Sequence, residues 1–313
     1  MLILIFLLIS SLVSIHCQFL PEPFIRVLKP SKFPYPNGTD VYILQNLLKI
    51  RYNIAITSAY DDQTVQFVNQ FKSSIGLPAD SIFDEATATA ILLPPKLGGL
   101  GYDGYKDDGQ APSVLGYMYK LHVKFYWNRS IETIADFIST NGTILKSYPV
   151  RGKGHEVGNF PQNFPYWNSS GIGLNEFSSD GATPTGLAEF DLNSPESDPV
   201  AFGPFPVNRV VRGLKGNVAW TVTNAASTTI RDGILHHTGQ WFQYIYPGTG
   251  KNWTPGDLMP NSLGCLHAYP ENIYFVWQTL VNDLNVQVRP NTNGALPYPY
   301  KPQGLISVEC MDC

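Results

Sequence analysis

A cysteine and two adjacent histidines are the side chains in this sequence best suited to covalent chemistry. Cys265 directly follows Gly264, and a glycine at that place permits a tight turn that exposes the sulfur atom. A thiol that attacks a carbonyl group needs a base within hydrogen-bonding reach and backbone N–H groups for the oxyanion. Upstream, His236 and His237 can supply the base. The backbone amides of Gly264 and Cys265 can supply the oxyanion donors, so the pattern predicts thiol-dependent acyl transfer.

The two histidines are expected to point in different directions. Residues 233–239 are typical of a strand that ends in a turn, and successive side chains of a strand lie on opposite faces. Only one of His236 and His237 can therefore face the sulfur atom. The other is expected to be structural, with its hydrogen bonds made to the backbone or to solvent.

These residues allow two other interpretations. The first is a zinc site, because cysteine and histidine are ligand types for zinc and His267 lies close to Cys265 in the sequence. Adjacent histidines on a strand diverge, however, and no Cys pair or His-Glu-x-x-His helix supports a metal, so we expect neither a metal nor a cofactor. The second is a buried, unreactive Cys265, which would make the chain a binding protein without catalytic activity.

The N-terminal segment and the cysteine count indicate export. Residues 1–17 begin with an uncharged apolar run that is typical of a secretory signal, with a retained membrane anchor as the alternative. Three cysteines then remain for an oxidising compartment. Cys310 and Cys313 are close enough to pair, which leaves Cys265 as a free thiol. We expect a secreted or extracellular protein, or one in an endolysosomal lumen if the source is eukaryotic.

Charge and composition exclude other classes of partner. The formal net charge is -4 over 313 residues, and Lys and Arg form no stripe that could follow phosphates or an anionic membrane. We therefore expect no nucleic-acid partner and no stable membrane insertion after removal of the signal. Asn-x-Ser/Thr sequons mildly indicate a secreted glycoprotein, and they begin at Asn37, Asn128, Asn141, Asn168 and Asn252.

Three short helices are predicted near the N-terminus, over residues 39–50, from Asp62, and from near Asp84. Within residues 38–93 the chain contains, in order, Asp40-Val41, Leu44-Gln45, the stretch from Thr64 to Phe71, Gly76-Leu77, and Phe83-Asp84 followed by Thr87. This order of residues resembles a peptidoglycan-binding domain of the small three-helix type. The resemblance implies a peptidoglycan partner.

The remainder of the chain is predicted to be mainly β. Residues 94–116 are rich in Gly, Pro and Asp and are typical of a linker, residues 117–290 form the main domain, and residues 291–313 form a C-terminal tail. Short β-type runs are expected at residues 143–145, 218–222 and 286–288, and one helix is expected over residues 271–283. The predicted fold class is thus multidomain, with a small all-α three-helix bundle followed by a mainly β domain that has a helix behind Cys265.

The segments around the histidines and Cys265 resemble the signature of the L,D-transpeptidase catalytic (YkuD) family. In that family a His at a strand end precedes a Ser-x-Gly-Cys element, which Ser262, Gly264 and Cys265 match in order. The resemblance extends over most of residues 140–290, and it includes Thr183-Pro184-Thr185-Gly186 as a turn and Tyr148-Pro149-Val150 as the strand before it.

The resemblance implies roles for individual residues. Cys265 would be the nucleophile, His237 its base with His236 as the alternative, and the backbone carbonyl of Thr238 the group that orients the base. Gly264 and Cys265 would hold the oxyanion, and the positions expected to contact the substrate are Ser262, His267 and Trp241. The family usually has Arg two residues after the Cys, and His267 departs from that pattern.

The resemblance also implies the substrate. Cys265 would attack a carbonyl between an L-centre and a D-amino acid in a peptidoglycan stem peptide, form a thioester and release the D-residue. The expected partners are the stem peptides and the glycan of peptidoglycan. An amine acceptor would then give a cross-link, as in an L,D-transpeptidase. Water would give an L,D-carboxypeptidase or a peptidoglycan-degrading hydrolase, and the sequence leaves these outcomes open.

Overall fold

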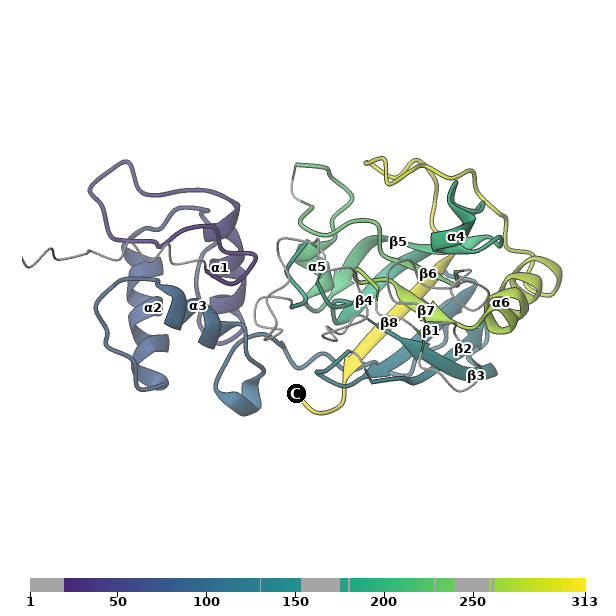
Figure 1. Cartoon of the computed structure of the whole chain (residues 1–313), viewed down its shortest axis with the longest axis horizontal. Coiled ribbons are helices and arrows are strands. Elements are labelled where there is room, and N and C mark those ends of the chain that lie inside the picture. Colours follow the sequence, from purple (N-terminus) through teal and green to yellow (C-terminus); the bar gives the residue numbers. More distant parts are fainter. Residues whose placement is uncertain are drawn as a thin grey trace, which may run out of the picture.

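We describe the protein from a computed structural model that covers residues 20–129, 131–152, 175–179, 181–227, 229–239, 259 and 262–313. A helical bundle is followed by a β-barrel, at the left and right of Figure 1. The expected signal over residues 1–17, the sequons at Asn168 and Asn252, and Trp241 lie outside the described residues. Within the described part of the chain, no helix is long and apolar enough to cross a bilayer.

Three helices make up the bundle, which confirms the helices predicted from the sequence. They are α1 (Thr39–Lys49), α2 (Asp62–Ser74) and α3 (Glu85–Ile91). Asp61 and Asp84 cap α2 and α3, since each carboxylate accepts a hydrogen bond from the backbone N–H group three residues later, at 2.8 and 2.9 Å. The apolar faces of the helices close on one another, so the bundle has its own hydrophobic core.

A closed barrel forms the second domain, with the described strands in the order β1-β2-β3-β7-β6-β5-β4-β8. β6 pairs in parallel with β7 and β1 with β8, whereas the other neighbours are antiparallel. Closure removes the free edges that an open sheet would expose. The strands are β1 (Tyr119–Phe125), β2 (Thr133–Ser139), β3 (Ile144–Arg151), β4 (Gly186–Asn193), β5 (Val207–Lys215), β6 (Leu235–His237), β7 (Leu266–Ala268) and β8 (Gly304–Cys310).

Helix α6 (Pro270–Asn282) begins almost directly after β7, as the sequence predicts. Pro270 stands at the start of this helix, where its fixed φ angle is favourable and its missing N–H group costs nothing. Ile273, Val276 and Leu280 recur at helical spacing and are buried in the barrel core. The helix therefore anchors the short strand that follows Cys265. The other helical turns are η1 (Pro95–Leu97), η2 (Pro112–Leu115), α4 (Pro199–Phe202) and α5 (Val218–Thr221).

Two of the predicted β-type runs are not strands. Residues 218–222 form the helix α5 and its C-cap, where Thr221 donates a side-chain hydrogen bond to the carbonyl oxygen of Asn217. Residues 286–288 precede Arg289, which makes an isolated bridge to Asn193 of β4. A short apolar run fits the buried side of either type of element, so its tertiary neighbours decide which one forms.

The segment expected as a C-terminal tail contains a strand of the barrel. β8 lies between β1 and β4 and pairs with both along its length. The barrel domain therefore extends past the boundary expected at residue 290. The run Leu305-Ile306-Ser307-Val308 is a β-type signal, but its partners are far away in the sequence, so the sequence alone does not indicate that it completes a sheet.

The segment expected as a linker, residues 94–116, runs along the barrel. The backbone N–H group of Asp107 donates to the carboxylate of Glu309 on β8 at 3.1 Å. The side chain of Asp107 forms a buried ion pair with Lys120 of β1 at 2.9 Å. These contacts hold the connection between the two domains against the sheet.

Aromatic side chains join the bundle to the barrel domain. Phe177 belongs to the loop before β4, yet it is buried in the hydrophobic core of the bundle. Its ring stacks on that of Trp220 in α5, with centroids 5.0 Å apart. Trp220 also meets the ring of Tyr42 in α1 edge-on. The bundle is therefore packed against the α5 side of the barrel.

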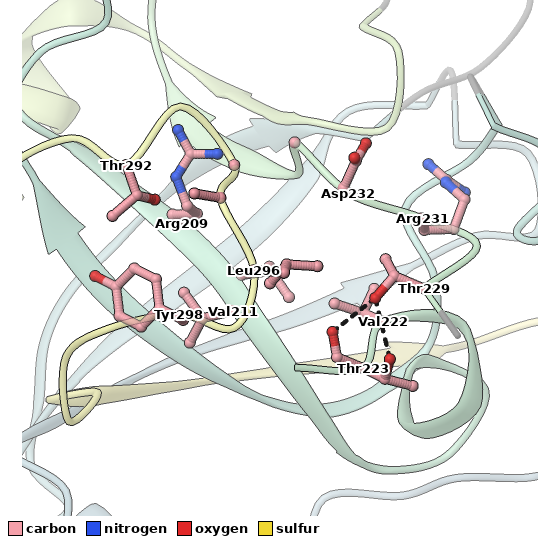
Figure 2. Close-up of a pocket in the computed structure, with 14 residues that line it drawn as sticks. Arg209, Val211, Val222, Thr223, Thr229, Arg231, Asp232, Thr292, Leu296 and Tyr298 are labelled. Carbon is pink, nitrogen blue, oxygen red and sulfur yellow. Dashed lines mark hydrogen bonds between the residues drawn. The ribbon is translucent and has the colours of Figure 1, made fainter. Parts of the chain in front are cut away.

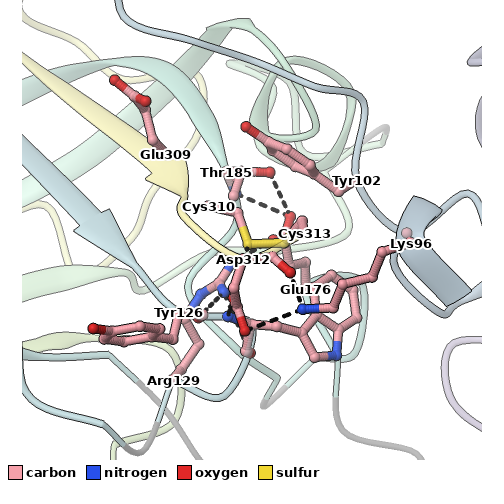
Figure 3. The surroundings of a disulfide bond; sticks show 12 residues. Lys96, Tyr102, Tyr126, Arg129, Glu176, Thr185, Glu309, Cys310, Asp312 and Cys313 are labelled. Atoms are coloured by element: carbon pink, nitrogen blue, oxygen red, sulfur yellow. Dashed lines mark hydrogen bonds and ion pairs between the residues drawn. A yellow bond between two sulfur atoms is a disulfide. The ribbon is translucent and has the colours of Figure 1, made fainter.

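The last residues of the chain fold back on the barrel domain (Figure 3). Cys310 and Cys313 form a disulfide, as their spacing indicates. Between them, Asp312 accepts a hydrogen bond from the backbone N–H group of Trp127 at 2.5 Å and pairs with Lys96 at 3.1 Å. The C-terminus is thus tied to the end of the bundle and to the start of the barrel.

Removal of β8 tests whether this segment is a strand of the barrel or a dispensable tail. We expect a chain truncated after residue 303 to be unfolded, because β1 and β4 would both lose a partner and the barrel would open. Asp312→Ala is the control, since it removes only contacts of the C-terminal turn and should cost about 1 kcal/mol. Thermal unfolding followed by circular dichroism measures both. A truncated chain that still unfolds cooperatively would contradict the closed barrel.

Candidate active site

Strands β6 and β7 lie side by side and bring the predicted base and nucleophile to one place. In their parallel pairing His237 is opposite His267, and Cys265 stands immediately before β7. The sulfur atom of Cys265 accepts a hydrogen bond from the backbone N–H group of Leu235 at 3.4 Å. The thiol can donate to the carbonyl oxygen of Gly233, which is 3.3 Å away. The free thiol is therefore fastened to the segment that carries the histidines.

The two histidines of β6 occupy opposite faces of the sheet. His236 points into the barrel, where its Nε2 lies 3.2 Å from the hydroxyl of Tyr148 and the two rings stack. Leu235 packs against Cys265 in a separate small cluster and not in the barrel core. Because His237 is two residues after Leu235, it lies on the same face as Cys265. The structure thus brings His237, and not His236, to the side of the thiol.

A short hydrogen bond fixes the orientation of His237. Its Nδ1 lies 2.6 Å from the carbonyl oxygen of Thr238, so the neutral ring donates from Nδ1 and keeps its acceptor position at Nε2. Burial lowers the pKa of His237 to about 4, and the Thr238 carbonyl opposes this shift. Near neutral pH the imidazole is therefore uncharged and able to accept a proton.

The thiol is also uncharged near neutral pH. Burial raises the pKa of Cys265 to about 11, although the N–H group of Leu235 and the positive charge of Arg231 favour the thiolate. The resting site therefore contains a neutral thiol and a neutral imidazole instead of an ion pair. Attack by the sulfur atom then requires that a base remove the proton as the new bond forms.

Side-chain hydroxyl groups hold the turn before Cys265. Ser262 donates to the carbonyl oxygen of Cys265 at 2.5 Å and accepts from the N–H group of Gly264 at 3.2 Å. Thr183 donates to the carbonyl oxygen of Gly264 at 2.9 Å. Ser262 was expected to contact the substrate and the Gly264 amide to hold the oxyanion, yet here both are engaged within the turn. The residue types do not reveal this engagement, because it depends on how the turn closes.

A buried arginine supports the same turn. The guanidinium of Arg231 donates to three carbonyl groups of the loop before β4, at 2.6, 3.1 and 2.8 Å, which belong to Glu176, Gly181 and Ala182. It also lies against Gly264, whose φ angle is +100° and where an added Cβ would come within 2.2 Å of Nη2. Only glycine fits at this position.

The side chain of Glu176 ties this loop to the barrel (Figure 3). Its carboxylate pairs with Arg129 at 2.5 Å and accepts from the Thr185 backbone N–H group at 2.9 Å. The side-chain amide of Asn217 donates to it at 3.0 Å. A buried ion pair needs such additional partners to offset its loss of hydration. Residue spacing does not reveal this network, apart from the turn around Thr185 that the family resemblance singled out.

His267 lies beside the expected base. Its ring centroid is 4.8 Å from that of His237, and the rings meet edge to face. In the pairing of β7 with β3, His267 is opposite the buried Arg151. Three basic side chains therefore lie at one level of three neighbouring strands. The guanidinium of Arg151 therefore lies next to His267, the position two residues after Cys265. This guanidinium comes from β3 and not from β7.

Potential metal ligands come together at a different place. Among the described side chains, one group of three lies close enough to share an ion, and it consists of Cys310, Asp312 and Cys313. The two sulfur atoms are bonded to each other, which leaves Asp312 as the donor. This group therefore does not form a complete ligand set.

A family model matches the part of the chain that contains the bundle. Residues 37–91 match the family described as a peptidoglycan binding domain. This match confirms the resemblance seen over residues 38–93, and it agrees with the positions of α1, α2 and α3. No curated protein matches the chain significantly.

Several solved structures are similar to the chain at low identity. An L,D-transpeptidase from Xylanimonas cellulosilytica is 13% identical, with 90% of this chain and 100% of that chain covered and a TM-score of 0.27. An L,D-transpeptidase from Stackebrandtia nassauensis is 10% identical, with 90% and 96% covered and a TM-score of 0.27. A fused Zn-dependent amidase/peptidase with a peptidoglycan-binding domain from Clostridium acetobutylicum is 11% identical, with 90% and 99% covered and a TM-score of 0.24. TM-scores at this level do not establish a common fold.

Substitution of Gly264 tests the support of the turn by Arg231. Gly264→Ala should lower the free energy of unfolding by about 3 kcal/mol or more, because the new Cβ would collide with the guanidinium and the φ angle is unfavourable for alanine. Gly233→Ala is the matched control, since Gly233 also has a positive φ angle but open space around it. It should cost about 1 kcal/mol. Chemical denaturation measures both, and equal effects would contradict the contact with Arg231.

Acid should destabilise the protein through the histidines of β6. Burial lowers the pKa of His236 to about 3 and that of His237 to about 4, below the value of about 6.5 in an unfolded chain. The unfolded chain therefore binds more protons, so the free energy of unfolding falls as the pH decreases from about 6.5 to about 4. Urea denaturation across this range measures the slope.

The slope of the free energy of unfolding against pH should be smaller in the variant His236→Phe. That variant keeps an aromatic ring against Tyr148 and removes one titrating group. Other groups that titrate in this range contribute equally to both proteins, so the difference between the slopes isolates His236. Identical slopes would contradict a neutral, buried His236.

Proposed function

We propose that this protein is a cysteine acyltransferase that acts on peptidoglycan stem peptides, with the reaction of an L,D-transpeptidase. The observation that carries the proposal is the placement of Cys265 and His237 on one face at the junction of β6 and β7. The hydrogen bond from His237 to the Thr238 carbonyl supports it, because that bond turns Nε2 into the proton acceptor. The peptidoglycan binding domain over residues 37–91 supports the substrate class.

In the proposed first step, Cys265 attacks a carbonyl carbon of the stem peptide. Nε2 of His237 takes the thiol proton as the C–S bond forms, and the amide of Cys265 donates to the oxyanion. The C–N bond then breaks, and His237 returns the proton to the leaving amine. The enzyme is left as a thioester, and His237 is again neutral.

In the proposed second step, an acceptor attacks the thioester. An amine of a second stem gives up a proton to His237 and attacks the thioester carbonyl. The new peptide bond forms, the C–S bond breaks, and His237 returns the proton to the sulfur of Cys265. Water in the same position gives an L,D-carboxypeptidase or a hydrolase, with the same residues in the same roles. The product therefore depends on which acceptor reaches the thioester and on how well water is excluded.

The uncharged resting states of Cys265 and His237 are compatible with this mechanism. Because the pKa of His237 is about 4 and that of Cys265 about 11, neither group is charged between these values. Charge arises only as the thiol attacks the carbonyl and gives its proton to His237, and it is neutralised when His237 protonates the leaving amine. The substrate is cell-wall material, so we also propose that the protein acts outside the membrane and is secreted.

Acylation by a carbapenem tests the nucleophile and its base. Carbapenems resemble the scissile bond, and we expect the intact mass to increase by one adduct, located on Cys265 and absent from Cys265→Ala. His237→Ala should slow acylation by about 100- to 10,000-fold, the usual effect of removing a general base. Time-resolved intact mass spectrometry measures the rate.

Variants on the inner face of the sheet provide the control. His236→Phe and Tyr148→Phe alter the pair inside the barrel, so folded protein should be acylated at close to the wild-type rate. The absence of any adduct on Cys265 would favour a peptidoglycan-binding protein without catalytic activity. Normal acylation of His237→Ala would disprove its role as the base.

A further inference from the structure

A pocket on the outer face of β5 adjoins the proposed nucleophile (Figure 2). It is a small hollow with a cavity volume of about 20 Å³, partly open to solvent, between Arg209, the segment 231–233 and the C-terminal segment 292–298. We call it the Arg209 pocket. Gly233 lines this pocket, and the carbonyl oxygen of the same residue is 3.3 Å from the thiol of Cys265. The pocket and the thiol are therefore on two sides of one short segment.

The guanidinium of Arg209 is held in place and keeps an unused donor. Its Nε donates to Asn193 at 3.2 Å, and its Nη2 pairs with Glu196 and donates to Asn291. Nη1 makes no hydrogen bond with any described residue. An added Cβ at Gly294, which lines the pocket, would lie 4.0 Å from Nη1. Arg209 is only 5% exposed, so this donor is a preorganised group at the pocket wall.

A hydroxyl group without a partner lies in the same pocket. Oγ1 of Thr292 is buried and makes no hydrogen bond within the described structure. Figure 2 shows Thr292 at the same end of the pocket as Arg209. A buried hydroxyl without a partner costs free energy, so a ligand that bonds to it is favoured. A carboxylate has two acceptor oxygens and can bind Arg209 with one and Thr292 with the other.

The charges around the pocket also favour an anion. Arg209 and Arg231 line it at its two ends in Figure 2, and Asp232 is the one carboxylate among the lining residues. Asp232 is exposed, so water and salt screen its charge. Glu196 pairs with Arg209 but is not part of the lining, and it leaves Nη1 available.

The register of the sheet sets the distance between the backbones of Arg209 and Cys265. Arg209 of β5 pairs with Leu235 of β6, and the N–H group of Leu235 binds the sulfur atom of Cys265. β5 and β7 flank β6 on its two sides. Two strand spacings of about 4.8 Å, or about 10 Å in all, therefore separate the backbones of Arg209 and Cys265. An extended peptide covers this distance with about three residues.

We propose that the Arg209 pocket binds a carboxylate of the substrate peptide that lies about 10 Å from the carbonyl attacked by Cys265. This proposal rests on the proposed function, because it takes Cys265 as the point of attack. In a stem peptide whose acidic residue is linked through its side chain, the α-carboxylate of that residue is free. It lies several bonds before the attacked carbonyl and can span this separation. The pocket would thus select stems in which this carboxylate is not amidated.

Two synthetic tetrapeptides test the proposal. One is L-Ala-γ-D-Glu-L-Lys-D-Ala, and the other carries a carboxamide in place of the free α-carboxylate of its D-Glu residue. Calorimetry on the full chain with Cys265→Ala measures binding without turnover. We expect the carboxylate peptide to bind about 10- to 100-fold more tightly, the range for a charge-assisted hydrogen bond.

Substitutions in the pocket should change this preference. Arg209→Gln should abolish it, and Thr292→Val, which keeps the shape of the side chain, should reduce it. Arg209→Lys retains the positive charge and should keep part of the preference for the carboxylate peptide. Arg212→Gln is the matched control, because Arg212 is on the same strand and half exposed, and it should leave the preference unchanged. Thermal unfolding verifies that each variant is folded.

The outcomes separate this proposal from the proposed function. Equal affinity for the two peptides, or no binding of either, would overturn the Arg209 pocket. A carbapenem adduct on Cys265 of the wild-type chain reports the nucleophile independently. An adduct without a carboxylate preference overturns the pocket alone, whereas a preference that Arg209→Gln removes, without any adduct, overturns the nucleophile alone.

Discussion

The buried carboxylate of Glu176 is the interaction on which the geometry around the thiol depends. Its ion pair with Arg129 is shielded from water, so it is stable only while the surrounding donors also bind the carboxylate. These partners fix the loop before β4. The carbonyl groups of that loop bind Arg231, and Arg231 lies against Gly264. The position of the sulfur atom is thus set by side chains that are far apart in the sequence.

The same loop also contacts the helical bundle. Phe177, next to Glu176, is buried in the core of the bundle and stacks on Trp220. The bundle carries the match to the peptidoglycan binding domain. One short loop therefore contacts the bundle on one side and, on the other side, Arg231, which supports the turn before Cys265. The two domains are joined through packed side chains in addition to the connecting segment.

Burial determines the chemistry of the site as well as its shape. It keeps the thiol of Cys265 protonated, with a pKa of about 11, and keeps His237 neutral. A neutral thiol is a poor partner for disulfide exchange, because the thiolate is the reactive form. This property fits a free cysteine in a chain that also contains the disulfide between Cys310 and Cys313.

The sequence by itself determined the local features of this protein. Helix starts at Asp62 and near Asp84, the turn before Cys265 and the divergence of two adjacent histidines follow from rules that act over a few residues. Only the tertiary structure decided that His236 faces the barrel core and His237 the thiol, because the inner face of β6 is defined by strands distant in sequence. The engagement of the Gly264 amide and the role of β8 as a barrel strand depend on the same closure. The alternation of side chains gives β6 two faces, and closure of the barrel decides which face is inside.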